Sequence, residues 1–370
     1  MRTNATLVSP GRIDLRQPDV PPTRPRIVGV GTATPPFSYS QPELLELFRI
    51  DDQRIRSVFL NSAIERRFLT LPPARPDGTR GQETQAQLLE KHRTQCLEMG
   101  TSALLSCLEQ VGAELADVRY LCCVSSTGFL IPGLSAVLIR ELGLRQDCSR
   151  LDVVGMGCNA GLNGLNAVAG WASAHPGELA VMVCVEACSA AYVFDGTMRT
   201  SVVNSLFGDG AAAVALTAGN AGPVGPTVLG FASRIVPDAI DAMRFDWDEE
   251  HGRFSFFLDR DVPYVVGAHA EPVIDQLLSD AGARRTDISH WIIHSGGKKV
   301  IDSVMINLGL TRHDVRHTTS VLRDYGNLSS GSFLFSYQRL LEEGVVGAND
   351  HGVLMTMGPG STIETALVRW

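Results

Sequence analysis

Residues 151–174 read LDVVGMGCNAGLNGLNAVAGWASA, in which a β-branched run ends in glycines and passes into small and apolar residues. The pattern predicts a buried strand, a tight turn and a helix that begins near Cys158. Further apolar runs alternate with helical stretches along the chain and indicate an α/β protein with buried strands. These runs are 26–36, 118–127, 178–187 and 210–217. Ser40-Gln41-Pro42-Glu43 also predicts a capped helix over 40–49.

A weak internal repeat relates the two halves of the chain. Residues 110–128, QVGAELADVRYLCCVSSTG, align without gaps with residues 280–298, DAGARRTDISHWIIHSGGK, at a constant offset of 170. Each copy reads as a helix end, a turn and a buried strand that ends in a polar loop. Residues 226–236 open the second half much as 26–36 open the first. The repeat therefore predicts two similar α/β halves.

The repeat also sets the expected domain boundaries. The Gly/Pro-rich segment 218–226 predicts a seam between an N-terminal half over 26–217 and a C-terminal half over 218–370. Residues 1–25 are expected to form a loose N-terminal tail. They contain no apolar run that could act as a signal peptide or membrane span.

Composition narrows the class of function. The chain has 370 residues, of which 44% are hydrophobic and 19% charged, as expected for a folded protein with a large core. Its net charge is −8, and it has no basic run, so binding to nucleic acid or to an anionic membrane is not expected. The eight cysteines lack zinc-ligand spacing and are expected to be mostly buried thiols of a cytoplasmic protein.

Two glycine-rich segments do not indicate nucleotide binding. Gly29-Val30-Gly31 follows a strand, but the third glycine of a dinucleotide site is missing and Pro35-Pro36 prevents an immediate helix. Gly208-Asp209-Gly210 is typical of a tight turn ahead of a strand.

Cys158 is the candidate nucleophile. A thiol on a glycine-bounded turn points at a helix N-terminus, whose dipole favours the thiolate, and the glycines let a substrate approach. A structural buried cysteine is the alternative for this position.

Two distant polar residues complete a possible set. His294 stands at the end of the apolar run HWIIH, and Asn327 lies in the small-residue loop DYGNLSSGS. A Cys–His–Asn set suits thioester chemistry, in which the cysteine takes an acyl group and the other two residues hydrogen-bond an enolate. Taken singly, His294 could be a satisfied core histidine and Asn327 a turn cap.

These segments resemble the type III polyketide synthases of chalcone synthase type, which are built on the duplicated thiolase fold. The matching motifs, spread over residues 26–370, are GMGCNAG, HSGGKKVID, YGNLSSGSF, LFGDGAAA and GPGSTIET. The resemblance implies a layered αβαβα architecture and a homodimer. It also implies iterative decarboxylative condensation of malonyl-CoA on Cys158, with His294 and Asn327 as catalytic partners and no metal or organic cofactor.

Within the family, residues 59–73, 188–210 and 241–248 resemble a bacterial branch that joins four malonyl-CoA units into an aromatic C8 acyl-CoA. In this branch the resemblance also implies accessory proteins similar to enoyl-CoA hydratases. The aromatic gatekeepers of chalcone synthases align with Tyr192 and Phe256. The remaining residues of the expected substrate pocket are Ser126, Thr127, Ile131 and Met357. Thr197 could hold a carbonyl of the chain, although the sequence does not place it in the pocket.

The expected CoA-binding residues are Gly296, Gly297, Lys299, Arg54 and Arg56. Lys298 and Lys299 begin a possible helix, where positive charge could hold phosphates, although solvated surface lysines are the simpler interpretation. Arg54 and Arg56 match the basic positions of the family only loosely.

Other functions stay open at this point. A carrier-protein-dependent ketosynthase that makes one condensation shares the Cys–His–Asn set. A degradative thiolase is disfavoured because no cysteine follows Cys188. An inactive dimer partner that shapes the cavity of another synthase would not need the three reactive residues.

Overall fold

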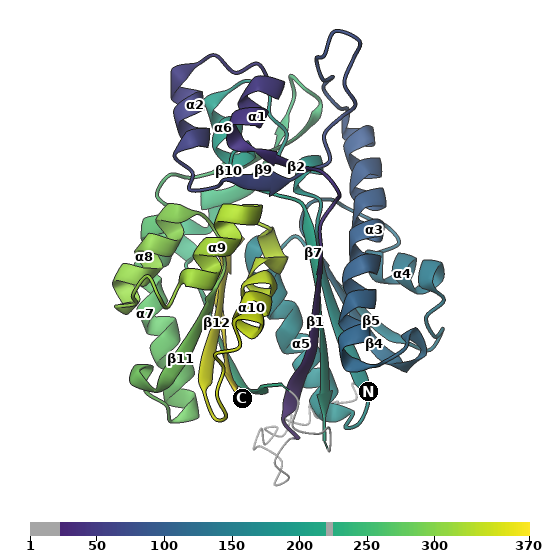
Figure 1. Cartoon of the computed structure of the whole chain (residues 1–370), viewed down its shortest axis with the longest axis vertical. Helices are drawn as coiled ribbons and strands as arrows, with labels where there is room; N and C mark the ends of the chain where they lie inside the picture. Colours follow the sequence, from purple (N-terminus) through teal and green to yellow (C-terminus); the bar gives the residue numbers. More distant parts are fainter. Residues whose placement is uncertain (1–22, 220–224) are drawn as a thin grey trace, which may run out of the picture.

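The computed structural model describes residues 23–219 and 225–370. Most of the expected tail, and residues 220–224 of the expected seam, lie outside this part of the chain. In the described part, nine strands form one mixed sheet (Figure 1). In spatial order they are β11 (Ile288–Ile293), β12 (His351–Gly358), β13 (Thr362–Arg369), β8 (Thr227–Ile235), β1 (Pro25–Ala33), β7 (Gly210–Ala218), β6 (Leu179–Glu186), β4 (Val118–Ser125) and β5 (Ser149–Val154).

The two halves repeat the same strand pattern outward from the centre. β1 and β8 meet at Arg26 and Thr227, and each pairs antiparallel with its other neighbour, β7 or β13. The next strands, β6 and β12, are antiparallel to β7 and β13 and parallel to β4 and β11. The predicted similarity of the halves is therefore confirmed, while the exact domain boundaries stay a prediction.

The aligned segments of the repeat have the same local structure. α3 (Gln85–Val111) and α7 (Val262–Ala281) both end at a left-handed glycine, Gly112 with φ 65° and Gly282 with φ 66°. A short 3-10 turn follows each helix and leads into β4 or β11. Glycine adopts this conformation without the Cβ penalty that other residues meet, which explains its place at both helix ends.

Helices cover both faces of each half-sheet. On β6, Val181, Val183 and Val185 pack toward α3, whereas Met182 and Cys184 pack toward α5 (Ala160–Ala174). α5 and α10 (Ser332–Glu343) both contact strands of the two halves and form the central layer. α7 and α8 (Lys298–Leu308) pack against each other on the outer side of the C-terminal half, with α7 in contact with β8 and β13. The result is the expected αβαβα layering (Figure 1).

Shorter elements gather at one end of the sheet. They are α1 (Gln41–Leu47), α2 (Gln53–Leu60), α6 (Met198–Asn204), the two-stranded sheet of β2 (Ser38–Ser40) and β3 (Arg66–Phe68), and the hairpin β9 (Met243–Asp248)–β10 (Arg253–Leu258). The remaining α-helices of the described residues are α4 (Leu134–Leu142) and α9 (Arg316–Tyr325). The helix expected at 40–49 is α1, capped by Ser40 and Glu43 as predicted but two residues shorter at its end. Among the described residues, no helix is long and apolar enough to cross a membrane.

Candidate active site

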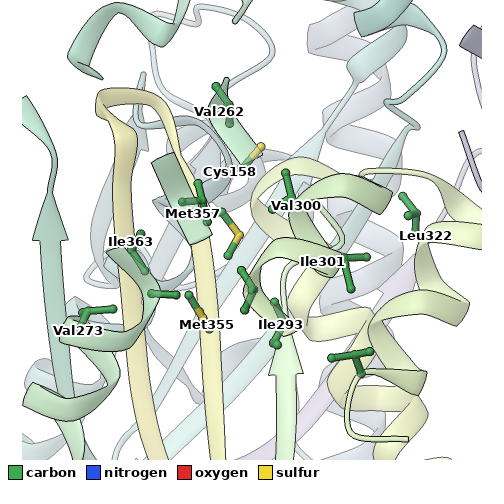
Figure 2. Packing of buried hydrophobic residues seen from close by; sticks show 14 of the residues in the cluster. Cys158, Val262, Val273, Ile293, Val300, Ile301, Leu322, Met355, Met357 and Ile363 are labelled. Atoms are coloured by element: carbon green, nitrogen blue, oxygen red, sulfur yellow. The ribbon is translucent and has the colours of Figure 1, made fainter. Parts of the chain in front are cut away.

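A cavity of about 1000 Å³ opens where the parallel strands of both halves end, and Cys158, His294 and Asn327 all line it. Cys158 follows β5 and His294 follows β11 directly, while Asn327 follows α9. Because the carboxyl ends of parallel strands lie at one edge of a sheet, residues far apart in the chain meet there. Figure 2 shows Cys158 with Val262, Val300 and Met357, which line the same cavity.

The turn that carries Cys158 has the predicted geometry. β5 ends at Val154, and Gly155 (φ 79°) and Gly157 (φ 72°) adopt left-handed conformations before α5 begins. The backbone N–H of Gly157 donates to Oγ of Ser126 at 2.9 Å. Of the eight cysteines, all within the described residues, Cys158 alone lines this cavity.

The charge state of Cys158 differs from the expectation. Burial raises the pKa of its thiol to about 12, although the side chains of Ser329 and Asn327 act in the opposite direction. Desolvation therefore outweighs the helix N-terminus, and the thiol is neutral at neutral pH. Burial raises the pKa of the other seven thiols too, so cavity access, not acidity, distinguishes Cys158.

His294 is held as a neutral donor. Its ring is 1% exposed, and burial lowers its pKa to about 3. Nδ1 is hydrogen-bonded to the hydroxyl of Ser332, the first residue of α10. A Cβ at Gly296 would lie 3.0 Å from Cδ2 and 3.2 Å from Nε2, so a larger residue would crowd this edge of the ring. When Ser332 donates to Nδ1, the single proton of the neutral ring is on Nε2.

Asn327 is oriented by its own loop. Its Oδ1 accepts a hydrogen bond from the backbone N–H of Ser329 at 2.8 Å. Its backbone N–H donates to the carbonyl of Leu206, and its carbonyl accepts from Gly208. With Oδ1 occupied, the Nδ2 group is the part of the amide left to donate to a substrate.

Close contact between the halves brings this loop to Cys158. A Cβ at Gly161, in the first turn of α5, would stand 2.2 Å from the carbonyl oxygen of Ser330. Only glycine at this position allows the Asn327 loop to rest on the helix that follows the cysteine.

Aromatic rings form one wall of the cavity. Tyr192 and Phe256, both predicted, line it and meet edge to face with centroids 5.2 Å apart. Phe207 and Phe245 also line it and were not predicted. The centroids of Tyr192 and Phe207 are 4.0 Å apart in a stacked pair. Phe207 lies within the LFGDG segment, whose sequence indicates only family membership and a turn.

The other predicted pocket residues separate into two groups. Ser126, Thr127 and Met357 line the cavity, and the Thr127 hydroxyl accepts from the backbone N–H of Ala187 at 3.0 Å. Ile131 does not line the cavity of this chain and is 82% exposed. Thr197 is also outside the lining, where it caps α6.

The expected CoA contacts divide similarly. Gly296, Gly297 and Lys299 line the cavity, whereas Arg54 and Arg56 do not. Arg54 is exposed, and Arg56 donates to the carbonyl of Ile50 at 2.9 Å. The same helix, α2, turns uncharged residues toward the cavity instead, and the cations of the lining come from other elements. These residues are Ser57 and Val58 on α2 and Asn61 just after its end, and Arg244, Arg260, Lys298 and Lys299 elsewhere.

A buried carboxyl that the sequence analysis did not single out lies close to Cys158. Glu186, the last residue of β6, accepts hydrogen bonds from the Ser126 backbone N–H at 2.9 Å and from the Ser330 hydroxyl at 2.5 Å. Burial raises its pKa to about 7, and its negative charge contributes to the raised pKa of Cys158.

Comparisons with known proteins agree with this arrangement. The family model for the N-terminal domain of chalcone and stilbene synthases matches residues 24–220, and that for the C-terminal domain matches residues 230–370. The 3,5-dihydroxyphenylacetyl-CoA synthase of Streptomyces toyocaensis is 69% identical over 354 residues, covering 94% of this chain and 91% of that protein. The enzyme of the same name from Amycolatopsis balhimycina is 67% identical, with 93% of each chain covered.

The fold has close counterparts among solved structures. The 1,3,6,8-tetrahydroxynaphthalene synthase of Streptomyces coelicolor A3(2), described as a bacterial type III polyketide synthase, superposes with a TM-score of 0.85. The two chains are 27% identical, and the alignment covers 93% of this chain and 99% of that one.

Proposed function

The chain belongs to the chalcone and stilbene synthase family of type III polyketide synthases, and from this premise we propose that it makes 3,5-dihydroxyphenylacetyl-CoA from four molecules of malonyl-CoA. The observation that carries the proposal is the identity of 69%, over 94% of this chain, to a synthase of that name. The cavity lined by Cys158, His294 and Asn327 supplies the chemistry.

Loading transfers an acyl group to Cys158. The sulfur attacks the thioester carbonyl, the bond to the CoA sulfur breaks, and the thiol proton leaves with the released CoA. Because the free thiol is neutral, this proton has to move during the transfer rather than before it. The glycines on either side of the turn leave the sulfur accessible from the cavity.

Extension uses a second malonyl-CoA. Its carboxylate leaves as carbon dioxide, and the electron pair of the broken bond forms an enolate at the thioester. The Nε2–H of His294 and the Nδ2–H of Asn327 donate to the enolate oxygen, and both buried side chains are oriented beforehand by hydrogen bonds. The enolate carbon then attacks the acyl group on Cys158, forming the new carbon–carbon bond and releasing the sulfur. Decarboxylation supplies the carbanion, so the proposed chemistry uses no metal and no organic cofactor.

The aromatic wall supports a small starter. Tyr192, Phe207 and Phe256 place three rings against the cavity beside the cysteine. One malonyl unit, decarboxylated, would serve as starter, and three further units would complete the eight-carbon chain. Folding of this chain and loss of water would give the aromatic ring. Accessory proteins similar to enoyl-CoA hydratases would assist that step or the release of the product.

We also propose that the enzyme acts as a homodimer in the cytoplasm. Its eight cysteines are all free thiols, as expected in a reducing compartment. Convergence of Cys158, His294 and Asn327 on one cavity favours an active synthase over an inactive partner. The family match favours CoA substrates over the carrier-protein thioesters of a single-condensation ketosynthase.

Isotopically labelled malonyl-CoA tests the proposal. We expect mass spectrometry to find a C8 aromatic product that carries label from every unit, with or without accessory proteins in the assay. Adding p-coumaroyl-CoA should leave this product unchanged, because the rings of Tyr192, Phe207 and Phe256 are expected to restrict the starter to malonyl or acetyl size. If the aryl group enters the main product and no C8 aromatic forms, self-priming is wrong, whereas the Cys–His–Asn mechanism would still stand.

A further inference from the structure

One buried arginine contacts two parts of the active site from outside the cavity. Arg67 lies on β3, which pairs with β2 and contacts α9, the helix that precedes Asn327 (Figure 1). Arg67 is 1% exposed and does not line the cavity that holds Cys158. Any effect of Arg67 on the reaction must therefore pass through the residues that it contacts.

The guanidinium of Arg67 binds the wall segment, which we define as residues 204–207 at the end of α6. Nη1 donates to the carbonyls of Asn204 and Phe207, the latter at 2.7 Å. Nη2 and Nε donate to Oε1 of Gln41 at 3.0 and 3.3 Å. Buried carbonyls need such partners, because an unpaired one loses its hydration without compensation.

Gln41 binds a third carbonyl of the wall segment. Its Nε2 group donates to the carbonyl of Ser205 at 2.7 Å. Its Oε1 accepts from Arg67, which fixes the orientation of the amide. Gln41 is buried as well, so these hydrogen bonds form away from water. Arg67 and Gln41 therefore act as one unit on the wall segment.

The fourth carbonyl of the wall segment is bonded to a catalytic residue. The backbone N–H of Asn327 donates to the carbonyl of Leu206 at 2.9 Å, and the N–H of Gly208 donates to the carbonyl of Asn327 at 3.0 Å. Leu206 and Phe207 both line the cavity. The wall segment therefore carries part of the aromatic wall and also holds the backbone of the enolate donor.

Arg67 also touches the residue next to Asn327. Gly326 has φ 74°, and a Cβ there would stand 3.0 Å from Cγ and Cδ of Arg67 and 2.7 Å from the carbonyl oxygen of Leu206. Glycine lets the aliphatic stem of Arg67 pack directly against the chain just before Asn327. Arg67 thus reaches Asn327 by two routes, through the wall segment and through Gly326.

The positive charge of Arg67 is balanced within the protein. Burial lowers the pKa of its guanidinium to about 9, while the carboxylate of Asp209 acts in the opposite direction, so the group is protonated at neutral pH. Asp209 is held in turn by the backbone N–H groups of Thr70 and Ser189, at 2.8 and 2.7 Å. A charged fork can bind several carbonyls at once, which a single neutral donor cannot do.

We propose that Arg67 is a positioning residue for condensation, which holds the Asn327 amide and the Phe207 ring in one fixed arrangement around Cys158. The inference rests on the proposed function, in which Asn327 stabilises the enolate and the aromatic wall limits the starter. Arg67 takes no part in bond making. Loss of its hydrogen bonds should free the wall segment to move, which would impair the enolate step and relax the selection against larger starters.

Arg67→Met tests the proposal, because it keeps an unbranched apolar stem and removes every donor. We expect malonyl-CoA decarboxylation to fall about tenfold or more, since a small displacement of a catalytic group has a large effect on rate. Acetyl transfer from acetyl-CoA to Cys158 should be nearly unchanged, because it does not form the enolate. When acetyl-CoA and hexanoyl-CoA compete, the hexanoyl share of the acyl-enzyme should rise about threefold or more. Carbon dioxide release and intact-protein mass spectrometry measure these quantities.

Two further variants separate positioning from stability. Arg67→Lys keeps the charge and some of the donors, so its decarboxylation rate should lie between those of the unmodified protein and Arg67→Met. Leu108→Ala shortens a buried side chain of α3 outside the cavity lining, which destabilises the fold but should leave the ratio of decarboxylation to loading unchanged. If this ratio is normal in Arg67→Met, or falls equally in Leu108→Ala, Arg67 acts only in folding and the proposal is wrong.

The remaining outcomes are also decisive. If Arg67→Met does not fold, judged by circular dichroism, Gln41→Met takes its place, since Gln41 binds both Arg67 and the carbonyl of Ser205. A normal ratio of decarboxylation to loading in Gln41→Met would overturn the proposal. Both readouts are independent of the final product. An unmodified protein that releases carbon dioxide but forms no C8 aromatic would therefore refute the proposed product, while the comparison of variants would still decide the role of Arg67.

Discussion

The hydroxyl of Ser332 is hydrogen-bonded to Nδ1 of His294, and both residues are buried, at 0% and 1% exposure. Ser332 begins α10, whereas His294 follows β11, so the helix that starts after the Asn327 loop fixes the histidine ring. A neutral imidazole has one N–H, and a donor at Nδ1 places it on Nε2. The same short segment thus orients both donors to the enolate, Asn327 directly and His294 through Ser332.

Replacing Ser332 by alanine should slow malonyl-CoA decarboxylation about tenfold, the effect of losing one buried hydrogen bond that orients a catalytic group. Transfer of an acetyl group from acetyl-CoA to Cys158 should be nearly unchanged, since it does not form the enolate. Ser332→Cys, with a similar size and a weaker donor, should be intermediate. The rates are measured as carbon dioxide release and as acyl-enzyme formation by intact-protein mass spectrometry.

The matched control is Ser336→Ala, which removes a buried hydroxyl of the same helix; within the described residues this hydroxyl bonds only the carbonyl of Ser332. We expect this variant to decarboxylate at the normal rate. If loading and decarboxylation fall together in Ser332→Ala, the residue acts only in folding and the positioning role is wrong.

Replacing Asn327 by alanine should reduce decarboxylation about a hundredfold to a thousandfold, as when an oxyanion donor is removed. Acyl loading should survive, because the sulfur of Cys158 remains accessible. Carbon dioxide release and single-turnover acylation separate the two steps. Normal decarboxylation in this variant would exclude the amide from the enolate site.

Cys158→Ala should form no polyketide, because no other cysteine lines the cavity. Decarboxylation should continue through His294 and Asn327. In the unmodified protein, iodoacetamide should label Cys158 before the other seven thiols, and the rate should keep rising above pH 8, since burial raises the pKa to about 12. Peptide mapping measures both points. Full-length product from the alanine variant would refute the nucleophile assignment.

The raised pKa of Glu186 predicts that the free energy of unfolding falls as the pH rises. Burial raises its folded-state pKa from 4.5 to about 7, so folding favours the protonated carboxyl. This stabilisation is complete below pH 4.5 and is lost as the pH rises through about 7. The free energy of unfolding falls by about 1.4 kcal/mol for each pH unit between the unfolded and folded pKa values.

The measurement is the midpoint of thermal unfolding between pH 4.5 and 8, for the unmodified protein and for Glu186→Gln. The amide does not titrate, so the stability of the unmodified protein should fall relative to that of Glu186→Gln as the pH rises. A difference that stays constant over this range would show that Glu186 does not change its protonation there.

Local pattern was enough to predict the fold class, the duplicated halves and the turn at Cys158. The repeat between 110–128 and 280–298 encodes a helix end, a glycine and a strand, all of which depend on neighbours in sequence. Glycines 155 and 157 similarly predict the sharp turn, because few other residues adopt their left-handed conformations. Motif resemblance then linked Cys158, His294 and Asn327, although it could not give their orientation.

Tertiary structure alone decided which side chains share the cavity and in what charge state. Phe207 lines the cavity, Glu186 acts on Cys158 and Ser332 bonds His294, all from segments that carry no local signal of these roles, whereas Arg54 and Arg56 do not line the cavity. The sequence predicted a thiolate-favouring environment at Cys158 from its helix N-terminus, a feature of adjacent residues. Burial by elements of both halves raises the pKa instead. Desolvation depends on everything packed around a group, so it is set by the assembled fold and cannot be read from one stretch of chain.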